Sequence, residues 1–284
     1  MSSAGRSRGF GFARRPWRDL LARIRRQRSI VLGYHGVAEG RLRDDPSLLQ
    51  LSPRRFTGQL ELFVDAGFRF VTMSAFARLA DGRTPPPGLA VVTFDDGMRN
   101  NHDVAMPILR EYEIPATVYA TIGFIGGSSP WIGSAGDGAM MTAPQLRHLV
   151  AEGWELGAHT MTHPDLSTLD YAACRAEIEP SRTALEEIGG APVETFAYPF
   201  GRYGPEALAA VRDARFLAAV TTGSGSWDRF EMTRAMMGAI DPLPVVLLKL
   251  TDRYEPLLRS RPAQAARHAS KRLRSAVAGL RHRS

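Results

Sequence analysis

The chain has 284 residues, of which 44% are hydrophobic and 23% charged, the composition of an ordinary globular protein with a sizeable core. A single cysteine, Cys174, excludes an internal disulfide framework and a cysteine-based zinc site. The longest apolar runs are far shorter than the roughly 20 residues that a membrane-spanning helix needs. Composition therefore predicts an enzyme-sized globular domain.

The formal charge of +7 is concentrated at the two ends of the chain. Residues 1–28 hold nine Arg and one acid, and residues 259–284 hold seven Arg, one Lys and no acid. These segments together carry +16, so the rest of the chain carries −9. An acidic body between two basic extensions argues against a nucleic-acid partner, because the body would repel phosphate.

The first extension has the pattern of a short basic amphipathic helix. Its apolar residues recur at helical spacing with Arg around them, at Trp17, Leu20, Leu21 and Ile24. Such a helix could lie on an anionic membrane surface, and the tail from 259 repeats the pattern more weakly. Solvated ends without a specific role, or an Arg-rich transit peptide, are the alternatives. No secretory signal is evident, which predicts the cytoplasm or the inner face of its membrane.

Between the extensions, residues 29–258 alternate short β-rich runs with longer segments of helical period. The predicted strands are 30–33, 68–71, 89–94, 116–120, 154–158, 195–197 and 218–221. The predicted helices are 53–64, 73–79, 106–112, 144–152, 171–188 and 205–214. Repeated β-then-α units predict one α/β domain with a parallel sheet, either open or closed into a barrel. In both forms, chemistry collects where the strands end.

Two adjacent carboxylates, Asp95 and Asp96, follow the strand at 89–94. Their mutual repulsion indicates a positive group beside them, such as a metal ion. One Asp could then bind the ion while the other accepts a proton from water. An ordinary Asp-Asp-Gly turn is the alternative.

A histidine pair, His159 and His163, follows the strand at 154–158. Two His four residues apart in a helical turn point the same way and can share one metal ion. Combined with an Asp, they form a two-His-one-carboxylate face with open positions for water and substrate. The histidine pair or the aspartate pair alone is more often incidental. The two pairs together are the stronger indication of a metal site.

A third cluster, Tyr198-Pro199-Phe200-Gly201, follows the strand at 195–197. Proline, an aromatic residue and glycine in this order form a rigid turn whose backbone N–H groups could bind an oxyanion. A plain tight turn is the alternative.

With these motifs at this separation, the chain resembles the polysaccharide deacetylase family, which shares the NodB-homology domain of carbohydrate esterase family 4. The resemblance spans residues 30–241. It implies a distorted (β/α) barrel and a divalent metal ion, zinc first, with cobalt or nickel as alternatives. The implied reaction removes the N-acetyl group from an N-acetylhexosamine in a glycan substrate.

The resemblance also implies roles for individual residues. Asp95 matches the catalytic base, and the metal-binding residues match Asp96, His159 and His163. Phe200 stands where the family has a Tyr whose backbone N–H helps to bind the oxyanion, and Tyr198 lies beside it as a further substrate-binding candidate.

The chain departs from the family pattern at two places. Ala197 replaces an Arg that usually pairs with the base, and Arg99 or Arg202 could substitute for it. The usual late Leu-x-His motif is also absent. A branch resembling poly-N-acetylglucosamine deacetylases instead has an early Tyr-His, which Tyr34-His35 matches. We therefore expect His35 to be the general acid, unless it is a strand-end histidine with only local hydrogen bonds.

The sequence leaves two rival functions open. The same scaffold could hydrolyse another amide or an imide. Alternatively, the missing Arg and the missing late His would fit a catalytically degenerate module that binds a glycan or a membrane surface.

Overall fold

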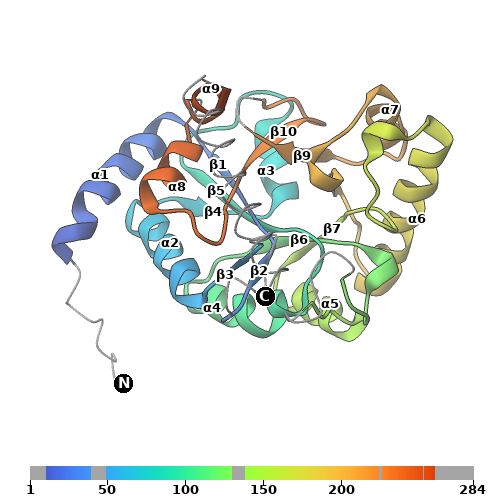
Figure 1. The fold of residues 1–284 in the computed structure, drawn as a ribbon, viewed down its shortest axis with the longest axis horizontal. Coiled ribbons are helices and arrows are strands. Elements are labelled where there is room, and N and C mark those ends of the chain that lie inside the picture. Colours follow the sequence, from blue (N-terminus) through green and yellow to red (C-terminus); the bar gives the residue numbers. More distant parts are fainter. Residues whose placement is uncertain (1–10, 40–48, 130–137, 224–225, 252, 260–284) are drawn as a thin grey trace, which may run out of the picture.

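The computed structural model describes residues 11–39, 49–129, 138–223, 226–251 and 253–259. Its strands form one large sheet surrounded by helices and one small sheet (Figure 1). The large sheet contains β1 (Ile30–Tyr34), β4 (Arg69–Phe70), β5 (Leu89–Phe94), β6 (Ala116–Ala120), β7 (Glu155–Ala158), β8 (Thr195–Ala197), β9 (Ala218–Thr222) and β10 (Met232–Met236). The small sheet pairs β2 (Gly36–Val37) with β3 (Gln50–Leu51).

The large sheet closes on itself. Its order is β1-β10-β9-β8-β7-β6-β5-β4, with β1 also paired to β5, and every pairing is parallel. Seven strands therefore form a barrel, and β4 lies outside it beside β5. This confirms the expected distorted (β/α) barrel in a single domain. Because Tyr34 pairs with Phe94, His35 and Asp95 leave the barrel at the same level.

The predicted helices form, several of them with proline in the first turn, where its missing N–H costs nothing. The α-helices are α1 (Gly11–Gln27), α2 (Pro53–Asp65), α3 (Met73–Ala80), α4 (Met106–Glu111), α5 (Ala143–Ala151), α6 (Tyr171–Gly189), α7 (Pro205–Asp213), α8 (Leu243–Lys249) and α9 (Tyr254–Arg259). Short turns of other helix types are the π-helix η2 (Asn101–Ala105) and the 3-10 helices η3 (Ile122–Phe124), η4 (Leu166–Thr168) and η5 (Pro199–Gly201). Side chains cap α2 and α6: Ser52 and Asp170 accept hydrogen bonds from backbone N–H groups of the first turns.

Strand side chains alternate between two separate cores, as the period of two requires. The larger core lies between the strands and the outer helices and includes Leu32, Val92 and Phe196. The smaller core includes Val91 and groups inward-facing strand residues with side chains of α3. Helix α3 therefore covers the amino-terminal end of the barrel and leaves the carboxyl-terminal end for the site.

Helix α1 changes the interpretation of the basic N-terminal extension. Leu21 and Ile24 are buried in the main core, and Trp17 packs partly against it. Three of the four stripe residues thus pack toward the barrel, whereas Leu20 is 41% exposed, so α1 packs against the domain through part of its apolar stripe. The C-terminal tail beyond Arg259 lies outside the described residues. In the described part of the chain, no helix is long and apolar enough to cross a bilayer.

Candidate active site

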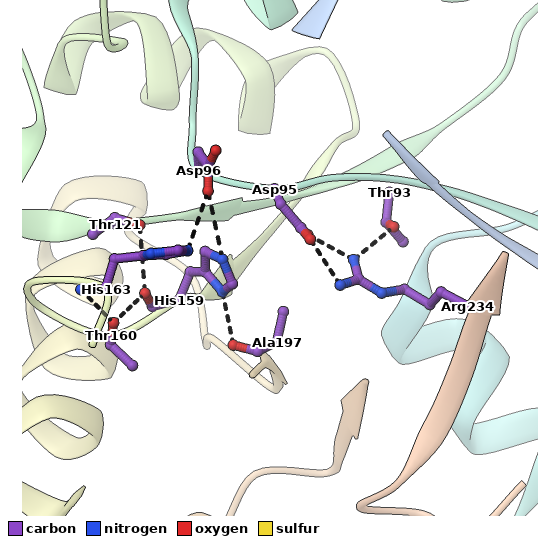
Figure 2. A network of polar contacts seen from close by, with 9 residues as sticks. All are labelled: Thr93, Asp95, Asp96, Thr121, His159, Thr160, His163, Ala197 and Arg234. Atoms are coloured by element: carbon purple, nitrogen blue, oxygen red, sulfur yellow. Dashed lines mark hydrogen bonds and ion pairs between the residues drawn. The ribbon is translucent and has the colours of Figure 1, made fainter. Parts of the chain in front are cut away.

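Asp95 and Asp96 occupy the loop that follows β5, and both are nearly fully buried, with 4% and 2% of their surface exposed. Asp96 and Gly97 have positive φ angles of 72° and 87°, which turn the backbone sharply. As a result, the two carboxylates point in different directions (Figure 2): Asp95 faces Arg234, and Asp96 faces His159 and His163.

The donor atoms of Asp96, His159 and His163 all lie within 4.8 Å of one another. Asp96 Oδ1 is 3.6 Å from Nε2 of His159 and 3.5 Å from Nε2 of His163. His159 donates its Nδ1–H to the carbonyl of Ala197 over 2.7 Å, which leaves a lone pair on Nε2. A carboxylate and two oriented imidazoles are the donors that zinc and similar divalent ions prefer, so these residues fit a bound metal ion.

The helical turn that was predicted between the two histidines is absent from the structure, so that prediction is wrong. Residues 159–163 form an irregular loop in which Thr160 and His163 have positive φ angles of 68° and 62°. Thr160 Oγ1 accepts from His163 N over 2.9 Å, and Glu177 of α6 accepts from the backbone N–H of Thr162 over 2.8 Å. Strained backbone held by its surroundings is typical of binding sites. This loop brings both imidazoles to Asp96 without a helix.

Burial and the neighbouring His159 lower the pKa of His163 to about 3. The imidazole of His163 is therefore neutral near pH 7, which is the form that binds a metal ion.

Asp95 forms a bidentate ion pair with Arg234 of β10. Nη1 lies 2.6 Å from Oδ1 and Nη2 lies 2.8 Å from Oδ2. The fully buried guanidinium also donates to Thr93 Oγ1 over 3.0 Å and to the carbonyl of Thr221 over 3.3 Å. Burial alone would raise the pKa of Asp95, but attraction to Arg234 outweighs it and holds that pKa well below its usual range. Asp95 is therefore ionised, and its oxygens can accept hydrogen bonds or a proton.

Of the remaining predicted residues, His35 and Phe200 lie at this site, whereas the side chain of Tyr198 is buried in the core. His35 directly follows β1, is half-buried, and acts electrostatically on both Asp95 and His163, so it belongs to this site. Phe200 is 57% exposed, has a φ of 58°, and places its ring centroid 4.6 Å from that of His163. Tyr198 is fully buried and stacks on Tyr203, so its side chain does not face a substrate.

Comparison with known proteins identifies the family. A family model described as polysaccharide deacetylase matches residues 82–219. The chitooligosaccharide deacetylase of Bradyrhizobium sp. (strain ANU 289) is 32% identical over 173 residues, which cover 58% of this chain and 71% of that protein. This chain belongs to the polysaccharide deacetylase family.

One further relative and one solved structure extend the comparison. The Bacillus subtilis (strain 168) protein YxkH, named for polysaccharide deacetylation, is 26% identical over 200 residues; the match covers 70% of this chain and about two thirds (66%) of YxkH. The solved structure of Streptococcus pyogenes deacetylase PplD in complex with acetate is 24% identical, with a TM-score of 0.67, covering 78% of this chain and 97% of PplD. The likeness to PplD shows the shared barrel fold.

Sequence reasoning missed Arg234. The charged partner of Asp95 is on β10 and not beside Ala197 of β8, and Arg202, one of the expected substitutes, pairs with Asp165 over 2.9 Å instead. Strand β10 was not predicted, because its inward positions hold methionine and arginine rather than β-branched residues. The alternation of Met232, Arg234 and Met236 on one face was the available signal.

Proposed function

We propose that this family member hydrolyses N-acetyl groups of an N-acetylhexosamine-containing glycan in a metal-dependent reaction and releases acetate. The observation that carries the proposal is the donor set of Asp96, His159 and His163 beside the Asp95–Arg234 ion pair. The Bradyrhizobium relative, named a chitooligosaccharide deacetylase, supports an N-acetylated oligosaccharide as the substrate class.

A divalent metal ion held by Asp96, His159 and His163, with zinc as the first expectation and cobalt or nickel as alternatives, would polarise the acetyl carbonyl and lower the pKa of a water. Asp95 accepts a proton from the water that attacks the carbonyl carbon. Arg234 keeps Asp95 ionised and oriented for that step. The backbone N–H of Phe200 donates to the oxygen on which negative charge develops.

His35 completes the scheme as the group that protonates the departing nitrogen. When the carbon–nitrogen bond breaks, the amine needs a proton, and an imidazole is a side chain that can donate one. The products are acetate and a free amino sugar, so water's oxygen ends on acetate. His35 and Asp95 leave adjacent paired strands, which supports opposite roles around one substrate group.

The test is acetate release from N-acetylglucosamine oligomers by the purified protein, first with zinc and then with a chelator. We expect release that the chelator abolishes and that zinc, cobalt or nickel restores. Asp96→Asn should lose both the bound metal and the activity, while Arg202→Ala, on the exposed Arg202–Asp165 pair, serves as the folded control. No release from a protein with metal bound would reject the glycan substrate.

That negative outcome would favour one of the two rivals. Small cyclic amides and imides test the alternative substrate class on the same site. If these also remain intact, a binding assay with the same oligomers tests the degenerate glycan-binding module.

We further propose a cytoplasmic location at the inner face of the membrane, with the basic extensions touching anionic lipid. The support is the exposed arginine side chains of α1, namely Arg18, Arg23 and Arg26. Because Leu21 and Ile24 are buried, this contact is electrostatic and involves no inserted apolar face.

A further inference from the structure

A second pair of histidines lies outside the site described above. His102 belongs to η2 and His148 to α5. Nε2 of His102 is 2.8 Å from Nδ1 of His148, and the ring centroids are 5.1 Å apart. The two elements come from separate parts of the chain, so the barrel brings this pair together.

A carboxylate stands at the outer nitrogen of each ring. Asp103 Oδ1 is 2.7 Å from His102 Nδ1, and Glu152 Oε1 is 3.7 Å from His148 Nε2. The cluster is thus a row of four groups, in the order carboxylate, imidazole, imidazole, carboxylate. Two further neighbours contact the cluster. Nε2 of Gln145 donates to Asp103 over 3.2 Å and lies 3.5 Å from His102 Nδ1, and Nη1 of Arg110 lies 3.7 Å from Oε2 of Glu152.

The outer carboxylates favour particular positions for the ring protons. A carboxylate accepts only, so the proton of His102 is on Nδ1 and its Nε2 carries a lone pair. Glu152 Oε1, at 3.7 Å, is too far from His148 Nε2 for a hydrogen bond, but its negative charge favours a proton on that nitrogen and hence a lone pair on the Nδ1 that faces His102. At 2.8 Å the two inner nitrogens can share a proton, and a cation can take the place of that proton when the rings move apart. A carboxylate behind a histidine is also the usual outer partner of a metal-binding imidazole.

We propose that His102 and His148 bind a divalent transition metal ion of the zinc class, at a site separate from Asp96, His159 and His163. Nitrogen atoms about 2.0–2.1 Å from a tetrahedral ion lie roughly 3.3 Å apart. The pair therefore has to open by about half an ångström. His148, with 47% of its side chain exposed, has the space to make that shift, and water completes the coordination.

The position of this second site indicates a structural effect. Element η2 follows the Asp95–Asp96 loop, and its Asn101 donates to the carbonyl of His35 over 2.7 Å. An ion that joins His102 to α5 therefore anchors the segment that supports His35. We expect the ion to stabilise the fold and not to take part in the reaction.

The test counts metal ions bound to the full-length protein, by equilibrium dialysis against zinc followed by elemental analysis. We expect two equivalents in the unmodified protein, one in His148→Ala, one in Asp96→Asn, and none in the double variant. Asp103→Asn should weaken zinc binding at the second site by about 10-fold to 100-fold, because it removes the outer partner of His102.

Controls separate this site from weak surface binding and from the proposed activity. A variant with His268→Ala and His282→Ala, which replaces both histidines of the C-terminal tail, should still bind two equivalents. His148→Ala should keep the first equivalent and acetate release, so failure of the deacetylase proposal leaves this metal count interpretable. One equivalent in the unmodified protein, unchanged in His148→Ala, would overturn the second site and leave a shared proton between the rings.

Discussion

The two ends of the barrel both hold carboxylates, but their surroundings differ: Glu155 at one end is half-buried, and Asp96 at the other is buried. At the amino-terminal end, Glu155 accepts from the backbone N–H of Ser74 over 2.7 Å and from the hydroxyls of Thr195 and Thr117 over 2.6 and 3.3 Å. Burial raises the pKa of Glu155. This carboxylate is surrounded by hydrogen-bond donors of the protein and so has a structural role.

At the carboxyl-terminal end, Asp96 faces the Nε2 atoms of His159 and His163 at 3.5–3.6 Å, which is too long for a hydrogen bond. Three of the residues with positive φ, Asp96, Thr160 and His163, lie in the loops here. Acceptors that converge on one point mark a place for a cation, whereas an acceptor enclosed by donors does not. The type of neighbour around each carboxylate therefore distinguishes the two ends of the barrel.

The largest expected effect compares the two ends directly. Asp95→Asn should lower kcat for acetate release by about 10²-fold to 10⁴-fold, because the proton acceptor is lost, while the metal content stays unchanged. Glu155→Gln is the matched variant at the other end. It should retain kcat and lower the free energy of unfolding by about 1–3 kcal/mol. Equal losses of activity in the two variants would contradict the assignment of the site to the carboxyl-terminal end.

The next effect isolates the ion pair that balances Asp95. Arg234→Met leaves a buried carboxylate without its partner and should lower the free energy of unfolding by about 3–5 kcal/mol, measured in urea. Adding Asp95→Asn to that variant should restore part of the loss, because the uncompensated charge disappears. The exposed pair of Arg202 and Asp165 supplies the control, since Arg202→Ala should cost less than about 1 kcal/mol. A double variant less stable than Arg234→Met would refute the pairing.

A smaller effect follows from the lowered pKa of His163. In the metal-free protein the native state holds this imidazole neutral down to about pH 3, whereas the unfolded chain protonates it near its ordinary value of 6.5. Stability should therefore fall as the pH drops through this window, by at most about 1.4 kcal/mol per pH unit. Urea unfolding of the metal-free protein at several pH values measures the slope, and His163→Gln should flatten it. An identical slope in both proteins would assign the pH dependence to other groups.

The smallest effect concerns the outer surface. Replacing Arg18, Arg23 and Arg26 with Glu should reduce binding to vesicles that contain phosphatidylserine, by about 1 kcal/mol per arginine at low salt. These side chains are exposed, so the fold should stay intact. Deleting residues 1–28 is not a clean alternative, because it removes the buried side chains of Leu21 and Ile24. Vesicle binding that is unaffected by the charge reversal would exclude a lipid contact through α1.

The site residues that the sequence identified are those that closely follow a recognisable strand. Asp95 and Asp96 follow a recognisable buried strand, and His159 and His163 follow another, so parallel pairing alone predicts that they meet at one end of the sheet. Apolar periodicity and proline at first turns similarly indicated most strands and helices. The irregular loop at 159–163 could not be predicted, because its shape depends on contacts with Glu177 of α6.

What the sequence by itself determined about this protein is its family, its α/β class and the residues of its candidate metal site. Only the tertiary structure decided which charged group balances Asp95, which face of α1 is buried, and that His102 meets His148. Arg234 and Asp95 are 139 residues apart and come into contact because β10 closes the barrel beside β1. A local sequence pattern indicates how one segment folds. Which residues become partners where the barrel closes depends on the register of strands that are distant in the chain.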